Sequence, residues 1–370
     1  MKAHLSSTSS SEPLTEPLTE HAPAAPAAHA WWVSLRPFAW AAVILLLLEL
    51  AGRALLPAAQ LDVAFASGRQ RTEELPAPPV QLMGDSVVAG GVFAGLIGSD
   101  ELGVRNDAVQ ATTPVHSYFI FKREIETGRR PQYVLLAHHP RTFEQVRVPA
   151  LIASFARWSE VPDILWTSGG SRDSGYGVLT KMSYLLRHRD QLRALLTRAD
   201  TTWMDQPATS QLADDERISS YLRQRDQADF RLEAPSPQYI ELQRRPFVVS
   251  KQNDIYFRRL LALAKREQIP VYWVHVPVSP QVRDLRASQG HDAGFKEYLQ
   301  QFVTSGELSL LGAGPLVLPA DHFEDWSHVN TAGAIRFSCH IGYLWRTVRT
   351  PASSVPAVCQ PYSQDWHNGS

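Results

Sequence analysis

The sequence predicts an α/β protein, a three-layer α/β/α sandwich with a mainly parallel sheet, preceded by a single N-terminal transmembrane helix. Short apolar runs alternate with longer stretches of helical periodicity from about residue 80 to residue 350. A long apolar segment lies close to the N-terminus. Reactive polar residues directly follow one of the apolar runs, and in parallel sheets such residues gather where the strands end.

Residues 1–79 are predicted to lie outside the folded domain. Residues 1–30 are rich in Ser, Thr, Pro, Ala and Glu, so they bury too little apolar area to offset chain entropy and are expected to form a disordered tail. Residues 31–57 join an uncharged apolar core to flanking tryptophans, which predicts a transmembrane signal-anchor. A buried helix and a cleaved signal peptide are the alternatives. Residues 58–79 are expected to be a linker.

Residues 80–350 are predicted to form the domain itself. Its strands are expected at the short apolar runs, which are Val80–Met83, Val104–Val109, Tyr133–Ala137 and Pro270–Val278. Its helices are expected at the periodic segments, which run from Ser86 to Ile97, from Pro114 to Gly128, and over Val178–Arg198, Asn253–Gln268 and Thr331–Arg349. The polar residues at about 200–250 are predicted to be an insertion, and residues 351–370 a C-terminal tail.

The composition excludes several classes of protein. Lys and Arg number 36 against 37 for Asp and Glu, which gives a net charge of -1 and argues against nucleic acid as a partner. The two cysteines, Cys339 and Cys359, are too few for a four-cysteine zinc site or a disulfide-framework domain. A single disulfide between them stays open if the domain is exported.

Gly84-Asp85-Ser86 ends the first predicted strand and begins a helix. A serine in this position presents its oxygen at the edge of the sheet, and its backbone N–H at a helix N-terminus can stabilise an oxyanion. The alternative is an ordinary strand-to-helix turn in which the Asp or Ser only caps the helix.

Asp325-Trp-Ser-His328 directly precedes the last predicted helix. Acyl transfer by a serine needs a base that takes the hydroxyl proton and a carboxylate that holds the base in the right tautomer. A loop with Asp and His three residues apart can bring both to one place. The spacing also occurs often by chance.

In this order and at opposite ends of the domain, the two motifs resemble those of the SGNH or GDSL hydrolase family, whose fold is flavodoxin-like. The resemblance implies that Ser86 is the nucleophile, His328 the general base and Asp325 the residue that orients it. It further implies an oxyanion hole formed by the backbone N–H groups of Ser86 and Ala111. Ala111 lies in the segment 106–113, which resembles the second sequence block of the family.

Two departures from the family pattern stand out. Ala111 occupies the position of the oxyanion glycine, where a left-handed backbone would cost alanine about 1–2 kcal/mol. After the third predicted strand, the residues 137–141 replace the Gly-x-Asn-Asp of the family, whose Asn side chain is an oxyanion donor. Loss of such a donor costs on the order of 10²–10³ in rate unless His139 or Arg141 takes its place.

With its anchor, the chain most resembles the membrane-anchored branch of the family that modifies cell-envelope polysaccharides. The resemblance implies an ester hydrolase or O-acetyltransferase that forms an acyl-enzyme on Ser86, with an acylated polysaccharide or acyl donor as substrate and a membrane acyltransferase as partner. It places the chain in the inner membrane, with one span and a periplasmic domain. Arg53, Arg69 and Arg71 follow the span and oppose this orientation, but large C-terminal domains often translocate regardless of such charges.

Two other functions stay open. The altered blocks are compatible with a non-catalytic binding or assembly protein of envelope polymer biosynthesis built on the same scaffold, although such a protein has no chemical need for Ser86, Asp325 and His328. A soluble cytoplasmic esterase whose apolar segment is a docked helix is the third hypothesis.

Neither a metal nor another cofactor is expected. Six residues of the types that bind metals are candidate ligands, but they lack the His-Glu-x-x-His pattern of a zinc enzyme. They are His138, His139, His275, His322, Asp325 and His328. His275 is expected to be a hydrogen-bonded core residue within a strand. The arginines of residues 187–198 are expected to form a solvated helix face, with lipid headgroups or an acidic polymer as the alternative contacts.

Overall fold

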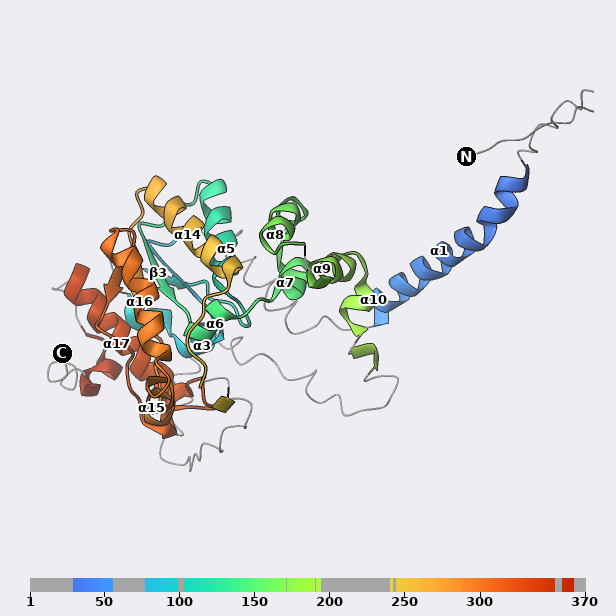
Figure 1. The fold of residues 1–370 in the computed structure, drawn as a ribbon. Coiled ribbons are helices and arrows are strands. Elements are labelled where there is room, and N and C mark those ends of the chain that lie inside the picture. The colour runs from blue at the N-terminus through green and yellow to red at the C-terminus, as the bar shows by residue number, and fades with distance from the viewer. Residues whose placement is uncertain are drawn as a thin grey trace, which may run out of the picture. The chain divides into compact units, whose positions relative to one another are not determined.

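The computed structural model describes residues 29–55, 77–98, 103–170, 172–189, 191–193, 240–241, 244–349 and 355–362 (Figure 1). The chain divides into two units, residues 1–51 and residues 52–370. The expected disordered tail lies outside the described residues except for residues 29–30. Most of the expected linker and of the insertion at about 200–250 also lies outside them.

The first unit contains most of helix α1, which spans His29–Leu55. Within it, Leu35–Ala54 is long and apolar enough to cross a membrane, and only 6% of the window is buried. Large apolar side chains such as Phe38 and Trp40 are exposed along the helix. The expected apolar helix is therefore present, whereas the side of a membrane on which either end lies stays a prediction.

The second unit is built on a five-stranded parallel sheet. Its strands are β1 (Val80–Gly84), β2 (Val104–Asn106), β3 (Tyr133–Ala137), β4 (Val271–Val274) and β5 (Ser309–Leu311), in the spatial order β2-β1-β3-β4-β5. In the register of the sheet, Gly84 pairs with Ala137 and Leu82 with Asn106. The carboxyl ends of β1 and β3 therefore lie side by side, and the α/β class with a parallel sheet is confirmed.

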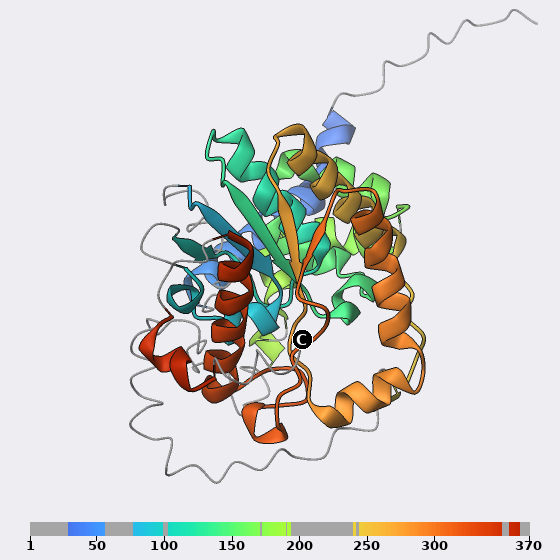
Figure 2. The same cartoon turned by 90° about the vertical axis from the view of Figure 1, so that its left-hand side faces the viewer.

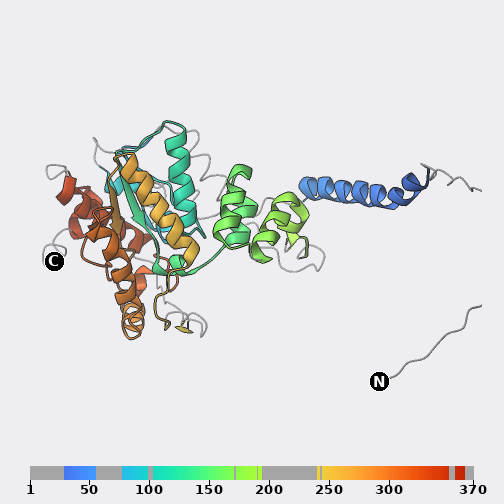
Figure 3. The ribbon, with the colours of Figure 1, turned by 45° about the horizontal axis from the view of Figure 1, so that its top comes forward.

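Strand side chains alternate between two hydrophobic clusters, as the period of a strand requires. Met83, Leu136 and Trp273 pack with α5 (Pro114–Glu126), α14 (Lys251–Arg266) and α16 (His291–Thr304). Leu82, Leu135 and Tyr272 pack with α3 (Ser86–Gly91) and α17 (Thr331–Arg349). Figure 2 shows α17 and α16 on different sides of the sheet, and Figure 3 shows α5 and α14 next to each other. Both faces of the sheet are thus buried against helices.

Two strand boundaries differ from the prediction. β2 ends at Asn106 rather than at Val109, because the Asn106 side chain accepts a hydrogen bond from the backbone of Ala108 and donates one to the carbonyl of Val88. Apolar character alone does not show this turn. β4 ends at Val274, so His275 follows the strand instead of lying within it.

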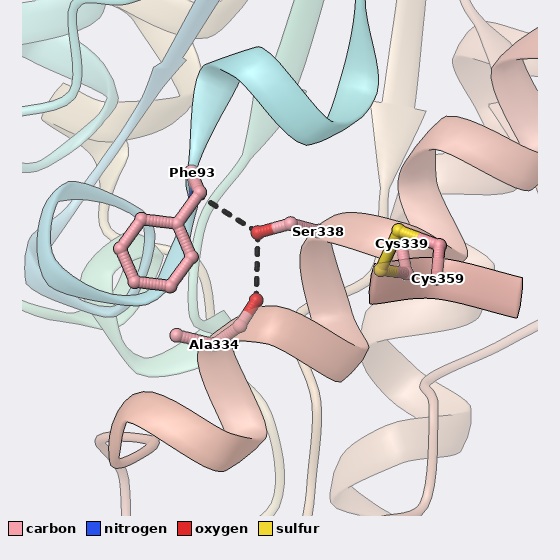
Figure 4. Close-up of a disulfide and its surroundings, with 5 residues drawn as sticks. All are labelled: Phe93, Ala334, Ser338, Cys339 and Cys359. Carbon is pink, nitrogen blue, oxygen red and sulfur yellow. Dashed lines mark hydrogen bonds between the residues drawn. A yellow bond between two sulfur atoms is a disulfide. The ribbon is translucent and has the colours of Figure 1, made fainter. Parts of the chain in front are cut away.

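Two of the expected helices are broken. The segment after Ser86 forms α3 and then α4 (Ala94–Ile97), with a break at Phe93, whose N–H donates to Ser338 Oγ at 2.8 Å (Figure 4). The segment 178–198 contains the end of α9 (Arg172–Met182) and α10 (Tyr184–Arg187), and Ser183 Oγ caps the second helix.

The remaining short elements were not expected from the sequence. They are α6 (Pro140–Glu144), α7 (Val148–Ala150), α8 (Val161–Thr167), α15 (Pro280–Ala287), a π-helix at Leu151–Phe155, and 3₁₀ turns at Trp158–Glu160, Ala320–His322 and Ala357–Cys359. The expectations also omitted α16 and β5.

Cys339 on α17 and Cys359 in the C-terminal segment form a disulfide (Figure 4). Both cysteines are fully buried in a cluster with Phe93 and Phe323. The bond therefore ties residues 355–362, which belong to the expected C-terminal tail, to the helix that follows the Asp325–His328 loop.

Replacing both cysteines with alanine is expected to lower the free energy of unfolding by about 3 kcal/mol, because the bond closes a loop with a sequence separation of 20 residues. Urea denaturation of the full-length chain in detergent, followed by tryptophan fluorescence, measures this. Wild type treated with a reductant is the control and should lose a similar amount. Equal stability of oxidised wild type and the double variant would contradict the expectation.

Candidate active site

Contacts with β3 and with the start of α3 determine the conformation of the Gly84-Asp85-Ser86 turn. A Cβ at Gly84 would collide with the carbonyl oxygen of Ala137 on β3, so β1 can end this close to its neighbour only with glycine. Asp85 Oδ1 accepts a hydrogen bond from the N–H of Val87 at 3.0 Å and so caps α3. Ser86 is consequently the first residue of the helix and lies at the carboxyl edge of the sheet.

The loop that carries Asp325 and His328 is held as a tight hairpin. Phe323 and Val329 form an antiparallel bridge, and the N–H of Glu324 donates to the carbonyl of His328 at 2.8 Å. At the base of the loop, Gly333 of α17 leaves no room for a Cβ against the carbonyl oxygen of His322. The loop is thereby packed directly onto the start of α17.

These two segments, 242 residues apart in the chain, meet through side chains. His328 Nε2 lies 2.8 Å from Ser86 Oγ, and His328 Nδ1 lies 2.8 Å from Asp325 Oδ2. The other carboxylate oxygen of Asp325 accepts hydrogen bonds from the backbone N–H groups of Ser327 and His328 at 2.7 and 2.8 Å. The carboxylate is therefore fixed, and it sets the imidazole tautomer that leaves Nε2 free to accept the serine proton.

The electrostatics of the pair favour a basic His328. The hydrogen bond to the Asp325 carboxylate raises the pKa of His328 above its usual 6.5, although partial burial opposes the shift. Burial would raise the pKa of Asp325, but the hydrogen bonds from the side chain and backbone of His328 outweigh it and lower that pKa to about 2. The carboxylate is thus ionised throughout the range in which His328 titrates.

A reaction in which His328 takes a proton from Ser86 should slow down in acid. Because the pKa of His328 is raised, the imidazole becomes protonated, and useless as a base, as the pH falls through a value above 6.5. We expect kcat/KM to fall tenfold per pH unit below that midpoint, measured from about pH 5 to 9. A profile that stays flat down to pH 5 would contradict a basic role for His328.

A cleft of about 370 Å³ opens in front of these residues. Its lining includes Ser86, Ala111, Arg147, Glu324 and His328. No hydrogen bond joins the N–H of Ser86 or of Ala111 to another described residue; that of Ser86 is the first of its helix and has no intrahelical partner. Both residues thus bring an unused donor to the cleft.

Ala111 has a left-handed backbone, with φ of 57°. Arg147 donates from its guanidinium to the carbonyl oxygen of Ala111 at 3.3 Å, which helps to hold this peptide in place. A non-glycine residue in this conformation is strained, and such strain is commonly found at functional sites. The sequence position that resembles the oxyanion glycine therefore has the conformation for which glycine is best suited.

Ala111→Gly is expected to raise the free energy of unfolding by about 1 kcal/mol, because glycine adopts the left-handed region without strain. Activity should change by less than about threefold, since the N–H is retained. Gln268→Gly is the matched control, since Gln268 also has φ of 57° and does not line the cleft. Urea unfolding and ester turnover of both variants measure these effects. A lower free energy of unfolding for Ala111→Gly than for wild type would contradict a strained backbone at Ala111.

Asp85 lies fully buried behind Ser86. Its Oδ2 accepts a hydrogen bond from the N–H of His139 at 2.7 Å, and burial raises its pKa to about 6. His138 Nδ1 lies 3.9 Å from the same oxygen, and its Nε2 is 2.8 Å from Ser117 Oγ. The turn after β3 therefore supports the Asp85 carboxylate through a backbone donor.

His139 and Arg141, the two substitutes suggested for the missing Asn donor, are not among the described residues that line the cleft. His139 Nδ1 instead accepts a hydrogen bond from the N–H of Arg141 at 3.3 Å, and Arg141 lies near Glu144. Gln110, Arg147 and Glu324 do line the cleft and were not suggested. Single polar residues in loops form no pattern that sequence reasoning can recognise.

The other candidates of the sequence lie elsewhere. Within the part of the chain that the structure describes, no group of three or more His, Cys, Asp or Glu side chains is arranged to hold a metal. His275 is half-buried, makes no hydrogen bond to another described residue and lines a second cavity, so the expectation of a hydrogen-bonded core residue was wrong. Arg187, one of the arginines expected on a solvated helix face, is half-buried, and its guanidinium donates hydrogen bonds to the backbone carbonyls of Thr180 and Lys181.

No known protein-family model and no curated protein sequence matches this chain. The functional argument therefore depends on the residues of the site and on their geometry.

Proposed function

We propose that this chain is a serine-dependent ester hydrolase or O-acyltransferase that forms an acyl-enzyme on Ser86. The observation that carries the proposal is the continuous hydrogen-bonded line from Ser86 Oγ through the His328 imidazole to the Asp325 carboxylate. We further propose that the unit forms the three-layer α/β/α sandwich of an SGNH-type hydrolase. The parallel sheet, with helices packed on both faces, supports this arrangement.

In the proposed reaction, Ser86 Oγ attacks an ester carbonyl while His328 Nε2 removes the hydroxyl proton. The carbonyl oxygen becomes an oxyanion, which the N–H groups of Ser86 and Ala111 stabilise in this proposal by donating hydrogen bonds to it. His328 then returns the proton to the leaving alkoxide oxygen. The C–O bond of the substrate breaks and the acyl group stays on Ser86.

The second half of the reaction decides between the two activities. If water attacks the acyl-enzyme, a carboxylic acid is released and Ser86 is restored; if a sugar hydroxyl attacks, the acyl group is transferred. The cleft is open, and side-chain exposures of 37% for His328 and 57% for Asp325 leave space for a large acceptor. We propose an acylated cell-envelope polysaccharide as substrate, because a membrane helix would hold the site next to the envelope.

The same reasoning gives the location that we propose, an inner-membrane protein with a periplasmic catalytic unit. The disulfide between Cys339 and Cys359 supports this side, because disulfides persist in oxidising compartments. A membrane acyltransferase that supplies the acyl group is the partner that this reading implies.

The experiment is a single-turnover assay of the full-length chain in detergent with an activated acetyl ester. We expect rapid-quench intact mass to show an acetyl group on Ser86, which decays with time as water attacks it and decays faster when an oligosaccharide acceptor is added to a transferase. Appearance of acetyl-oligosaccharide marks a transferase, and free acetate alone marks a hydrolase. Failure of the folded chain to acquire acetyl from activated esters would contradict the proposal and favour a binding protein on the same scaffold.

A further inference from the structure

A second cavity, of about 300 Å³, lies at the same edge of the sheet as the Ser86 cleft. The turn after β3 contributes His138 and Pro140, the segment after β4 contributes His275, and α15 and α16 supply much of the remaining lining. The two cavities share no lining residue. Sites at the carboxyl ends of parallel strands commonly bind ligands, so this cavity can hold a molecule of its own.

The walls of the cavity are mostly apolar. The side chains of Val276, Phe295, Leu299 and Leu310 line it, and Phe295 and Leu299 are buried. An apolar lining of this kind favours a hydrocarbon group.

Two cations reach this apolar space. The side chain of Arg286 is only 5% exposed and its guanidinium pairs with Asp292, but its Nε has no hydrogen-bond partner among the described residues. Lys296 is exposed beside the cavity and forms no ion pair within the described part of the chain. A guanidinium that is buried among apolar side chains with a single carboxylate beside it is costly, which favours an anionic ligand in the cavity.

Among the side chains that line the cavity, the formal charges sum to one excess positive charge. Arg286 and Lys296 face a single carboxylate, that of Asp292. Burial lowers the pKa of His138 to about 3 and that of His275 to about 4, so both are neutral at pH 7. A monoanion would therefore balance the site, whereas a phosphate dianion would carry an uncompensated charge into apolar surroundings.

We propose that this cavity binds a small carboxylate with a short hydrocarbon tail. The carboxylate accepts from the Lys296 ammonium and lies beside the Arg286 guanidinium, which lines the cavity, and the tail packs against Val276 and Phe295. The proposal does not depend on the activity proposed for Ser86, because the two cavities share no lining residue.

The test uses butanoate and the full-length Ser86→Ala chain in detergent, so that turnover plays no part. Saturation-transfer NMR titration gives the dissociation constant. We expect butanoate to bind, and butan-1-ol, which has the same chain length without the carboxylate, to bind at least tenfold more weakly. Equal binding of the two compounds, or no binding of butanoate, would overturn the proposal.

Two further variants locate the site. Lys296→Met should weaken butanoate binding about fivefold, since it removes an exposed charge contact, and Lys251→Met, on a different helix, is the matched control. Ala293→Trp should weaken it at least tenfold, because Ala293 is an exposed residue of the lining and a large side chain there obstructs the cavity. Both substitutions are at exposed positions, where folding is tolerant. If both variants bind butanoate as tightly as Ser86→Ala alone does, butanoate binds elsewhere and the assignment to this cavity is refuted.

Discussion

Replacing Ser86 with alanine is expected to lower kcat/KM for an activated acetyl ester by a factor of about 10³–10⁶. The variant keeps the fold, because the half-buried Ser86 side chain bonds only to His328 among the described residues, and the backbone cap from Asp85 is untouched. It also keeps the two proposed oxyanion donors, the N–H groups at positions 86 and 111, so slow hydrolysis by bound water should persist. Ester turnover measures the loss of kcat/KM and the residual hydrolysis. Intact mass after incubation with the ester shows whether the chain still acquires an acetyl group.

Ser288→Ala is a suitable control for this experiment. Ser288 is an exposed residue that follows α15, and its hydroxyl donates to the carbonyl of Leu285. Its loss should leave turnover unchanged. Retention of more than about a tenth of wild-type activity by Ser86→Ala would show that another group is the nucleophile.

Changes at His328 and Asp325 are expected to have the next largest effects. His328→Ala removes the only described side chain that bonds Ser86 Oγ, and kcat should fall by a factor of about 10³–10⁶. Asp325→Asn should lower kcat by about 10⁴, because an amide can donate to Nδ1 and select the wrong tautomer. Initial rates with the acetyl ester, at a pH above the acid limb, measure both losses.

The chain contains a matched control for these two variants. His322 and Asp321 form another hydrogen-bonded His–Asp pair, at 2.8 Å, which does not include Ser86. His322→Ala should therefore keep kcat within a few-fold of wild type. Because Ser86, His328 and Asp325 act as a unit in the proposed mechanism, Ser86→Ala with His328→Ala should be no slower than Ser86→Ala alone. The triad would be contradicted if the losses of kcat from Ser86→Ala and His328→Ala added up in the double variant. It would also be contradicted if His322→Ala and His328→Ala lowered kcat equally.

The sequence was most informative where residue type and spacing follow a single physical rule. A mostly apolar run marked β1 and a continuous one marked β3, since strands buried on both faces show little polar alternation. The last helix was predicted with its observed bounds, Thr331–Arg349, because its apolar face repeats regularly. The Gly-Asp-Ser turn was evident from its position after an apolar run.

Other features depend on contacts that no local pattern contains. β5 has only three residues, and its first residue is exposed, so it is recognisable as a strand only through its pairing with β4. The break at Phe93 depends on Ser338, 245 residues away. Arg147 reaches the cleft through a contact with Ala111 that sequence distance conceals. Tertiary contacts decide each of these features, and the motifs cannot specify them.

The most direct test of the central claim is the reaction of the full-length chain with a fluorophosphonate, which labels only an activated serine. We expect intact mass and peptide mapping to show one adduct, on Ser86, and no adduct in His328→Ala. A folded wild-type chain that acquires no adduct, or an adduct that forms equally well without His328, would contradict an activated serine at Ser86.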